Sequence, residues 1–237
     1  MNDNDLVWRY MGFARFVWLL QKKRLWLSRV DKLEDEWELA LAGEQLEHVY
    51  LRRPFGTFGG EPTEEPIRER TRRVIMEWRE RSYVNCWCTL PHESHALWRV
   101  FCGPSEGVAI QTTLGKLKAN VSRLAVRSVN YDEPGRQRKT PELFELLQQK
   151  RKMFEYEHEV RVIGERGISD PNLIVGEFGI ECPFEPETAL EAVWVHPQAD
   201  TSFLETVVAT VDTYAPKLRA QVKWSSMRDK PPLFERV

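Results

Sequence analysis

The strongest candidate for chemistry in this sequence is the block EYEHEVR at residues 155–161. Side chains alternate along a β-strand, so Glu157, Glu159 and Arg161 would share one face if the block is extended. Two carboxylates that lie close together make the ionisation of either one harder, which suits general acid–base work. The block therefore predicts a polar cleft lined by these charges; the alternative is a strand face that meets only water.

A second candidate combines an arginine near the N-terminus with a serine further along the chain. Arg9 stands between Trp8 and Tyr10, and Ser28 ends a short strand expected over residues 25–28. A guanidinium in an aromatic setting can hold a phosphate through two parallel hydrogen bonds. Arg9 is thus a candidate phosphate ligand, and a purely structural arginine is the alternative.

Two groups of residues have the chemistry of metal ligands. The first group consists of cysteines and histidines, which are typical zinc ligands. Their spacing in the sequence is tighter than in common zinc sites. The preferred interpretation is therefore that the cysteines are reduced core thiols, and no metal is expected. Carboxylates could hold Mg²⁺ for a nuclease, but an acidic segment also complements the dipole at a helix start. The first group is Cys86, Cys88, His92 and His95, and the second is Asp31, Glu34, Asp35 and Glu38.

The elements that must position these residues follow from periodicity and turn signals. Helices are expected from residue 13 to the basic residues 22–24, from Asp31 toward Leu51, and over 68–81, 94–101, 140–156 and 201–214. Strands are expected over 25–28, 83–88, 107–111, 123–131, 159–163, 174–182, 192–196 and 221–224. The Gly-containing loop at 54–66 is long enough to act as a lid.

Helices and strands do not alternate regularly along the chain. This pattern favours an α+β fold with a mainly antiparallel sheet, whole or split, and helices on its flanks. Without a linker that would divide the chain, residues 1–237 are expected to form a single domain.

Composition indicates an ordinary globular protein. Of 237 residues, 42% are hydrophobic and 30% charged, and the net charge of −2 gives no overall field that would attract nucleic acid. Basic runs at 22–24, 68–73 and 148–152 are interpreted as solvated helix surface. Neither a signal peptide nor a membrane span is expected, and the four cysteines include no CxxC pair, so a cytoplasmic location with reduced thiols is predicted.

Several blocks together resemble the prokaryotic domain-of-unknown-function family 2971, whose members open with an aromatic–basic segment and continue with a strand ending in serine. An acidic segment, a Trp-containing helix, a Gly-Val-x-Ile strand and a Tyr-Glu-x-Glu-Val-Arg block follow. The matching residues are 8–10, 25–28, Asp35 with Glu38, 98–101, 107–110, 156–161, 193–197 and Ser225 or Ser226. Leu33-Glu34 and Glu36 depart from the family pattern, which puts the shape of the acidic turn in doubt.

The order Arg9, Ser28 and Glu157-x-Glu159 also resembles the Arg, Ser, Glu-x-Glu order of ADP-ribosyltransferases. That resemblance implies NAD as substrate, held by Arg9, Tyr10, Ser28 and Arg161. It implies that Ser28 supports the nicotinamide-ribose pocket, that Glu159 stabilises an oxocarbenium-like transition state, and that Glu157 activates the acceptor. Ser28 is followed by Arg29-Val30 rather than by the Thr-Ser of those enzymes.

Three functions therefore remain open from the sequence. The first is an NAD-dependent ADP-ribosyltransferase-like enzyme, acting as a toxin or phage-defence effector on a nucleic-acid or protein acceptor. The second is a Mg²⁺-dependent nuclease or nucleic-acid-processing toxin that uses Asp35, Glu38, Glu157 and Glu159. The third is a non-catalytic ligand sensor whose tryptophans form the binding platform.

Overall fold

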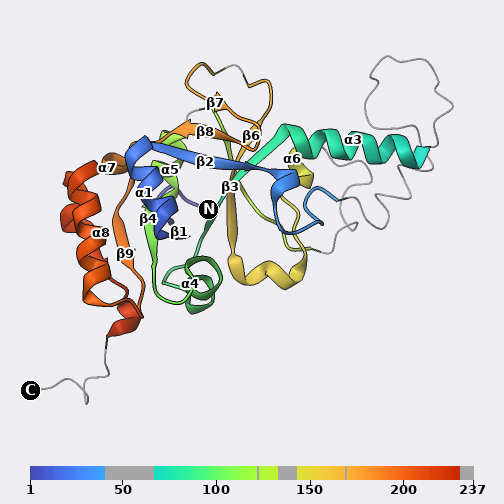
Figure 1. Cartoon of the computed structure of the whole chain (residues 1–237). Helices are drawn as coiled ribbons and strands as arrows, with labels where there is room; N and C mark the ends of the chain where they lie inside the picture. The colour runs from blue at the N-terminus through green and yellow to red at the C-terminus, as the bar shows by residue number, and fades with distance from the viewer. Residues whose placement is uncertain (41–66, 122, 133–142, 169, 230–237) are drawn as a thin grey trace, which may run out of the picture. The chain divides into compact units, whose positions relative to one another are not determined.

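The structure is a computed structural model that describes residues 1–40, 67–121, 123–132, 143–168 and 170–229. Tertiary contacts divide the chain into two compact units, each built from separate stretches of sequence. Unit 1 comprises Met1–Leu25, Cys86–Arg123 and Cys182–Val237, and unit 2 comprises Trp26–Asn85 and Leu124–Glu181. Both units combine helices with mainly antiparallel strands (Figure 1), which confirms the predicted α+β class. The single domain expected over 1–237 stays a prediction.

The sheet of unit 1 has the order β10-β9-β4-β1, and the end of β3 pairs with β1 through Cys88 and Trp8. Its pairs are antiparallel, except that β9 and β10 run parallel across the connecting helix α8. The bounds are β1 Leu6–Gly12, β3 Ser82–Cys88, β4 Gly107–Thr113, β9 Ala192–Val195 and β10 Val222–Trp224.

The longer helices of unit 1 each bury apolar residues. Trp98 of α4 meets Tyr10 of β1 edge to face, with ring centroids 5.1 Å apart. Phe13 of α1 meets Phe203 of α8 in the same way at 5.3 Å. The helical segments are α1 Phe13–Lys22, α4 His95–Cys102, α5 Leu114–Asn120, α7 Pro186–Ala189, α8 Thr201–Tyr214, η3 Pro216–Gln221 and η4 Ser226–Arg228.

Unit 2 is built around β3 and β6, which pair with each other. Strand β2 pairs with β3 through Ser28 and Val84, and β5 pairs with β6 so that Arg127 lies opposite Arg161. The bounds are β2 Arg24–Arg29, η1 Val30–Lys32, α3 Ile67–Arg81, β5 Ala125–Ser128, α6 Leu143–Leu146, η2 Lys152–Glu157, β6 Glu159–Glu165, β7 Ile174–Val175 and β8 Gly179–Pro183.

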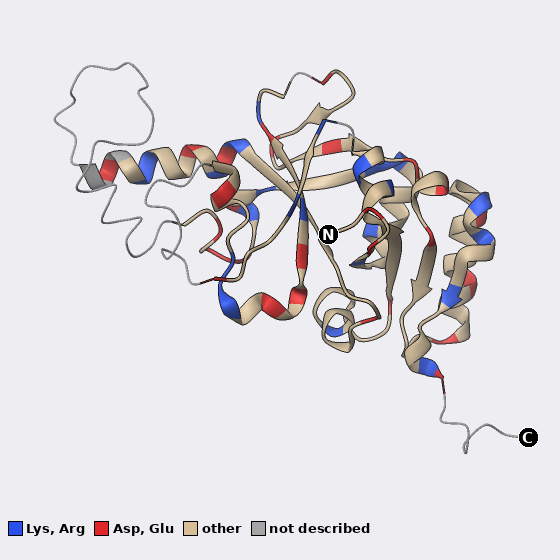
Figure 2. Ribbon diagram, turned by 180° about the vertical axis from the view of Figure 1, so that it is seen from behind, with Lys and Arg blue, Asp and Glu red and all other residues tan. Residues whose placement is uncertain are grey.

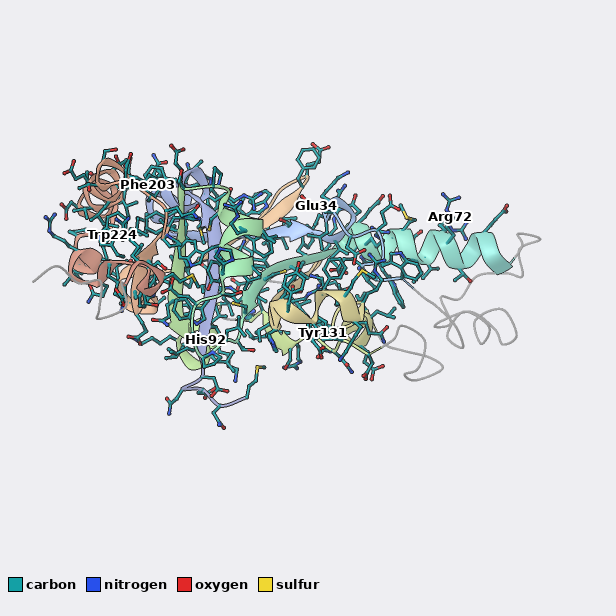
Figure 3. All side chains as sticks on the ribbon, turned by 90° about the horizontal axis from the view of Figure 1, so that it is seen from below. Glu34, Arg72, His92, Tyr131, Phe203 and Trp224 are labelled. Carbon is teal, nitrogen blue, oxygen red and sulfur yellow. The ribbon has the colours of Figure 1, made fainter. Side chains whose placement is uncertain are left out.

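Helix α3 is the most charged element of unit 2. Acidic and basic residues are interspersed along it (Figure 2), and Arg72 on its exposed side is labelled in Figure 3. Such a helix is expected to be largely solvated. The prediction of a charged helix ending at Arg81 is confirmed.

The helix predicted to start at Asp31 is wrong for the described residues. Only a single 3-10 turn, η1, forms there, and Asp31 does not cap it. The Asp31 carboxylate instead accepts hydrogen bonds from Nε and Nη2 of Arg29 at 2.6 and 2.9 Å. This pairing occupies the carboxylate, and residues 33–40 form bends and turns rather than a helix. The continuation toward Leu51 and the lid predicted over 54–66 lie outside the described residues.

The long helix predicted up to residue 156 is also wrong. Helix α6 ends at Leu146, and the chain then runs beside Asn130. The Asn130 N–H donates to the Gln148 carbonyl at 2.6 Å, and the Lys150 N–H donates to the Asn130 carbonyl at 3.0 Å. These backbone bonds replace helical ones, so the chain is extended where a helix would have continued.

Two further expectations from the sequence concern membrane spans and the state of the cysteines. Across the described ranges, no helix has both the length and the apolar character that a membrane crossing requires. All four cysteines are free thiols, with Cys88, Cys102 and Cys182 buried. Reduced thiols were expected from the sequence.

Candidate functional site

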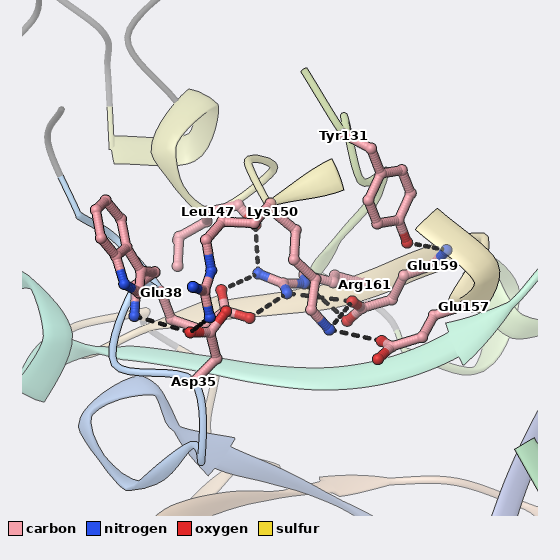
Figure 4. Close-up of polar contacts among 10 residues, drawn as sticks. Asp35, Glu38, Tyr131, Leu147, Lys150, Glu157, Glu159 and Arg161 are labelled. Carbon is pink, nitrogen blue, oxygen red and sulfur yellow. Dashed lines mark hydrogen bonds and ion pairs between the residues drawn. The ribbon is translucent and has the colours of Figure 1, made fainter. Parts of the chain in front are cut away.

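Arg161 lies at the centre of a buried polar cluster in unit 2 (Figure 4). Its side chain is only 1% exposed. Nη1 and Nη2 each donate to one oxygen of Glu38 at 2.7 Å, and Nη1 also donates to the Leu147 carbonyl at 2.9 Å. Nε and Nη2 donate to the two oxygens of Glu159 at 2.8 and 3.2 Å. These bonds use all five guanidinium N–H groups, so Arg161 fixes two carboxylates at once.

Lys150 joins a third carboxylate, that of Glu157, to this centre. Its Nζ lies 2.5 Å from an oxygen of Glu157 and 3.0 Å from an oxygen of Glu159. Burial works to lower the pKa of Lys150, but the charges of Glu159 and Glu157 outweigh it and raise that pKa above the ordinary value. Lys150 is therefore a cation at neutral pH and holds the two glutamates together.

Glu157 does not lie on the strand, which corrects the expectation that it shares a strand face with Glu159. It ends η2, and His158 then adopts a left-handed conformation with φ of 41° before β6 begins. This turn brings both carboxylates to Lys150 from different elements. Glu159 and Arg161 do lie on one face of β6, as predicted, and contact each other directly.

Burial sets the protonation of the groups beside Lys150. Burial raises the pKa of Glu157 above its ordinary value, against the opposing effect of Lys150. Burial likewise raises the pKa of Tyr131, so this phenol stays protonated at neutral pH. The Tyr131 oxygen accepts the Glu159 backbone N–H at 2.7 Å, which fixes the start of β6 (Figures 3 and 4). The site thus contains a carboxyl with a raised pKa at Glu157 and a neutral hydroxyl at Tyr131.

An outer ion pair borders the cluster. Nη2 of Arg151 donates to Asp35 at 2.8 Å, and the guanidinium carbon lies 5.4 Å from the ring centres of both Trp37 and Phe154. Together, Asp35, Glu38, Lys150, Arg151, Glu157, Glu159 and Arg161 are called the ion cluster below. In it three cations face four carboxylates, so these seven side chains carry one excess negative charge when all are ionised.

The sequence did not predict the two cations that complete the ion cluster. Lys150 and Arg151 belong to the basic run 148–152, which was interpreted as solvated helix surface; that interpretation is wrong for both. The helix ends before these two residues, and the chain there pairs with the backbone of Asn130; no local pattern in the sequence signals that backbone pairing. Tyr131 was also missed, because a lone tyrosine after a strand has no distinctive spacing.

The remaining predicted site residues lie elsewhere. Ser28 is half-buried on β2 of unit 2, where it pairs with Val84. Arg9 and Tyr10 belong to β1 of unit 1. Nη1 of Arg9 donates to the Cys86 carbonyl at 2.5 Å, and the Tyr10 hydroxyl accepts the Ser94 N–H at 2.9 Å. The roles that the resemblance implies for these three residues stay predictions.

The two groups of candidate metal ligands named from the sequence do not form a metal site in the described residues. Among the side chains that the structure describes, no three His, Cys, Asp or Glu residues come together in a way that could hold a metal ion. The four acids of the nuclease hypothesis do gather in the ion cluster, but each of them contacts an arginine or lysine.

Comparisons with known proteins add little to these observations. No protein-family model matches the chain, so the resemblance to family 2971 stays a prediction. No curated protein matches it by sequence. One similar solved structure is that of Thermus sp. 2.9 DarT in complex with ADP-ribosylated ssDNA. It is 12% identical and has a TM-score of 0.42, over 97% of this chain and 98% of that one. Because this similarity is so distant, the function of this chain has to be argued from its own residues.

The raised pKa of Glu157 predicts a pH-dependent stability. A carboxyl that holds its proton more tightly in the folded chain makes the free energy of unfolding fall as pH rises above the ordinary value of 4.5. Glu157→Gln cannot ionise, so it should flatten this fall. Urea unfolding between about pH 4.5 and about pH 7 measures it. Glu155→Gln, at an exposed neighbouring position, is the matched control; equal slopes for wild type and Glu157→Gln would contradict the prediction.

Proposed function

We propose that unit 2 binds NAD and breaks the bond between its nicotinamide ring and ribose, in the manner of an ADP-ribosyltransferase. The observation that carries this proposal is the excess negative charge of the ion cluster, with Glu159 held rigidly beside Glu157. The nicotinamide ring of NAD is cationic, and its departure leaves positive charge on the ribose. Fixed negative charge in a buried site stabilises such a transition state strongly.

Each of the two carboxylates has its own role in the proposed reaction. The ribose C1–N bond breaks, and its electron pair stays on the nicotinamide nitrogen, which becomes neutral. An oxygen or nitrogen of the acceptor then bonds to C1, and its proton passes to Glu157. The raised pKa of Glu157 suits a general base, because efficient bases have pKa values near the working pH. Glu159 supplies fixed negative charge from its buried position beside Lys150 and Arg161.

Arg161 and Lys150 are positioning residues in this proposal. Every Arg161 N–H already bonds within unit 2, which leaves none for a phosphate of NAD. This assignment replaces the NAD contact that the sequence suggested for Arg161. Rigid carboxylates need no reorganisation when charge develops on the substrate. The burial of both glutamates is therefore part of the proposed mechanism.

The acceptor is proposed to be a nucleic acid or a protein. Modification of such an acceptor, or depletion of NAD, would make the protein a toxin or a phage-defence effector. The cytoplasm is the proposed location, because it supplies NAD and keeps the four free thiols reduced.

Nicotinamide release by the purified wild-type protein tests the proposal. With NAD, and with candidate protein and nucleic-acid acceptors added one at a time, we expect release above the rate of buffer alone. Mass spectrometry should then find ADP-ribose on the acceptor. If NAD stays intact under all these conditions, the proposal fails. Mg²⁺-dependent cleavage of DNA or RNA without NAD would favour the nuclease alternative instead.

A further inference from the structure

Next to the ion cluster, the structure presents a fixed and half-exposed tryptophan. We infer that Trp37, backed by Arg151, is a stacking platform for the adenine ring of a nucleotide. The inference rests on the proposed function in taking NAD as the source of that ring. It assigns the distal end of the substrate to residues that the proposed chemistry does not use.

The position of Trp37 is set by contacts on both sides of it in the chain. Its backbone N–H donates to the Asp35 carboxylate at 3.1 Å, and its carbonyl accepts the Ala40 N–H at 3.0 Å. The same Asp35 carboxylate binds Arg151. The backbone of Trp37 is thus held on a short turn whose anchor, Asp35, is part of the ion cluster.

The ring itself is supported and yet open. The Arg151 guanidinium lies 5.4 Å from the Trp37 ring centre, within the range of a cation–π contact. Arg151 also lies 5.4 Å from the Phe154 ring, so the guanidinium is held between two aromatic side chains. Nevertheless 48% of Trp37 is exposed to solvent. An indole in this arrangement can accept a second planar group on its uncovered surface.

The charges around the platform favour a single base over a nucleic-acid strand. A strand is tracked by cations that neutralise successive phosphates. Here Lys150, Arg151 and Lys152 are each paired with a carboxylate. The described part of the platform therefore offers a stacking surface without a row of unpaired cations, which matches the end of a dinucleotide.

The platform and the catalytic carboxylates are also linked by direct contacts. Glu38 follows Trp37 in the chain and binds Arg161, which binds Glu159. A dinucleotide carries its two rings at opposite ends. In this arrangement one NAD molecule stacks its adenine on Trp37 and places its nicotinamide-ribose bond at Glu157.

Calorimetric titration with AMP, ADP-ribose and nicotinamide mononucleotide tests this inference without any turnover. Trp37→Ala should weaken binding of AMP and ADP-ribose about tenfold or more, the scale of one base–aromatic stack. Binding of nicotinamide mononucleotide, which has no adenine, should not change. Trp37→Phe keeps a smaller aromatic face, so its affinity for AMP and ADP-ribose should lie between those of the wild type and Trp37→Ala. Because Trp37 is half-exposed, both variants should melt like the wild type.

Trp224 provides the matched control. It lies at the end of β10 in unit 1 (Figure 3) and also carries a cation over its ring, with the Arg228 guanidinium carbon 3.7 Å from the ring centre. Trp224→Ala should leave the binding of all three nucleotides unchanged. An equal loss in both variants would show a general effect of removing tryptophan and would overturn the inference.

Other results separate this inference from the proposed function. If the wild type does not bind AMP, or if Trp37→Ala binds it as tightly as the wild type, the platform is overturned even when NAD is cleaved. If Trp37→Ala loses affinity only for a single-stranded oligonucleotide, the platform serves a strand and the adenine assignment is wrong. If AMP binds in a Trp37-dependent way but NAD is never cleaved, the platform stands and the proposed chemistry fails.

Discussion

Replacing Glu157 by glutamine should slow nicotinamide release and transfer by about 10²- to 10⁴-fold, the range that a general base contributes. The substitution keeps the size of the side chain and removes its ability to take a proton. Lys150 keeps its contact with Glu159 at 3.0 Å, so the rest of the ion cluster should persist. The loss should appear in kcat with little change in KM, because the proton is transferred only during the reaction.

The pH dependence of kcat distinguishes a general base at position 157 from a residue that only supports the structure. The wild-type kcat should rise with pH as Glu157 ionises, above the ordinary glutamate value of 4.5 because its pKa is raised. In Glu157→Gln this rise of kcat with pH should be absent. Glu155→Gln, two residues away and exposed, should behave like the wild type. A Glu157→Gln protein with wild-type kcat would remove Glu157 from the mechanism.

Glu159→Gln tests the proposed mechanism less cleanly than the sequence alone predicts. From the sequence alone, Glu159→Gln should lower activity and leave folding unchanged. In the structure, Glu159 binds both Arg161 and Lys150 and is buried. Removing its charge leaves two buried cations short of a partner, so stability should fall together with rate. Within the described part of the chain Glu157 forms an ion pair with Lys150 alone, and it is therefore the better probe.

Elements with a clear period were predictable from the sequence. Helix α8 spans residues 201–214 as expected, and β6 begins at Glu159 as expected. The failures share a cause. At Asp31 and at residues 147–151, polar contacts with distant or neighbouring groups replaced the expected helix. Periodicity reports which face of an element is apolar, but it does not report which backbone bonds the chain will prefer.

The candidate site was predictable only in part for the same reason. Alternation along β6 correctly placed Glu159 beside Arg161. The partners of these residues come from far away in the chain, as Glu38 and Lys150 show. A charged residue looks the same in the sequence whether it is solvated or buried in an ion pair. The ion pairs of Lys150 and Arg151 could therefore not be predicted from their basic run.

Replacing Arg161 by methionine should lower the free energy of unfolding by about 3–5 kcal/mol, the typical result of removing one partner from a buried ion pair. The change leaves the carboxylates of Glu38 and Glu159 buried without the four hydrogen bonds that Arg161 now donates to them. Methionine fills much of the same volume, so lost packing contributes little. Urea unfolding followed by circular dichroism measures the loss.

Arg127 is the matched control, because it lies directly opposite Arg161 on the neighbouring strand and is exposed. Arg127→Met should change stability by no more than about 0.5 kcal/mol. The double variant Glu38→Met with Arg161→Met should recover part of the loss, since it removes a buried charge as well as its partner. If Arg161→Met unfolds like Arg127→Met, the buried ion cluster does not hold unit 2 together, and the rigid carboxylates of the proposed mechanism lose their support.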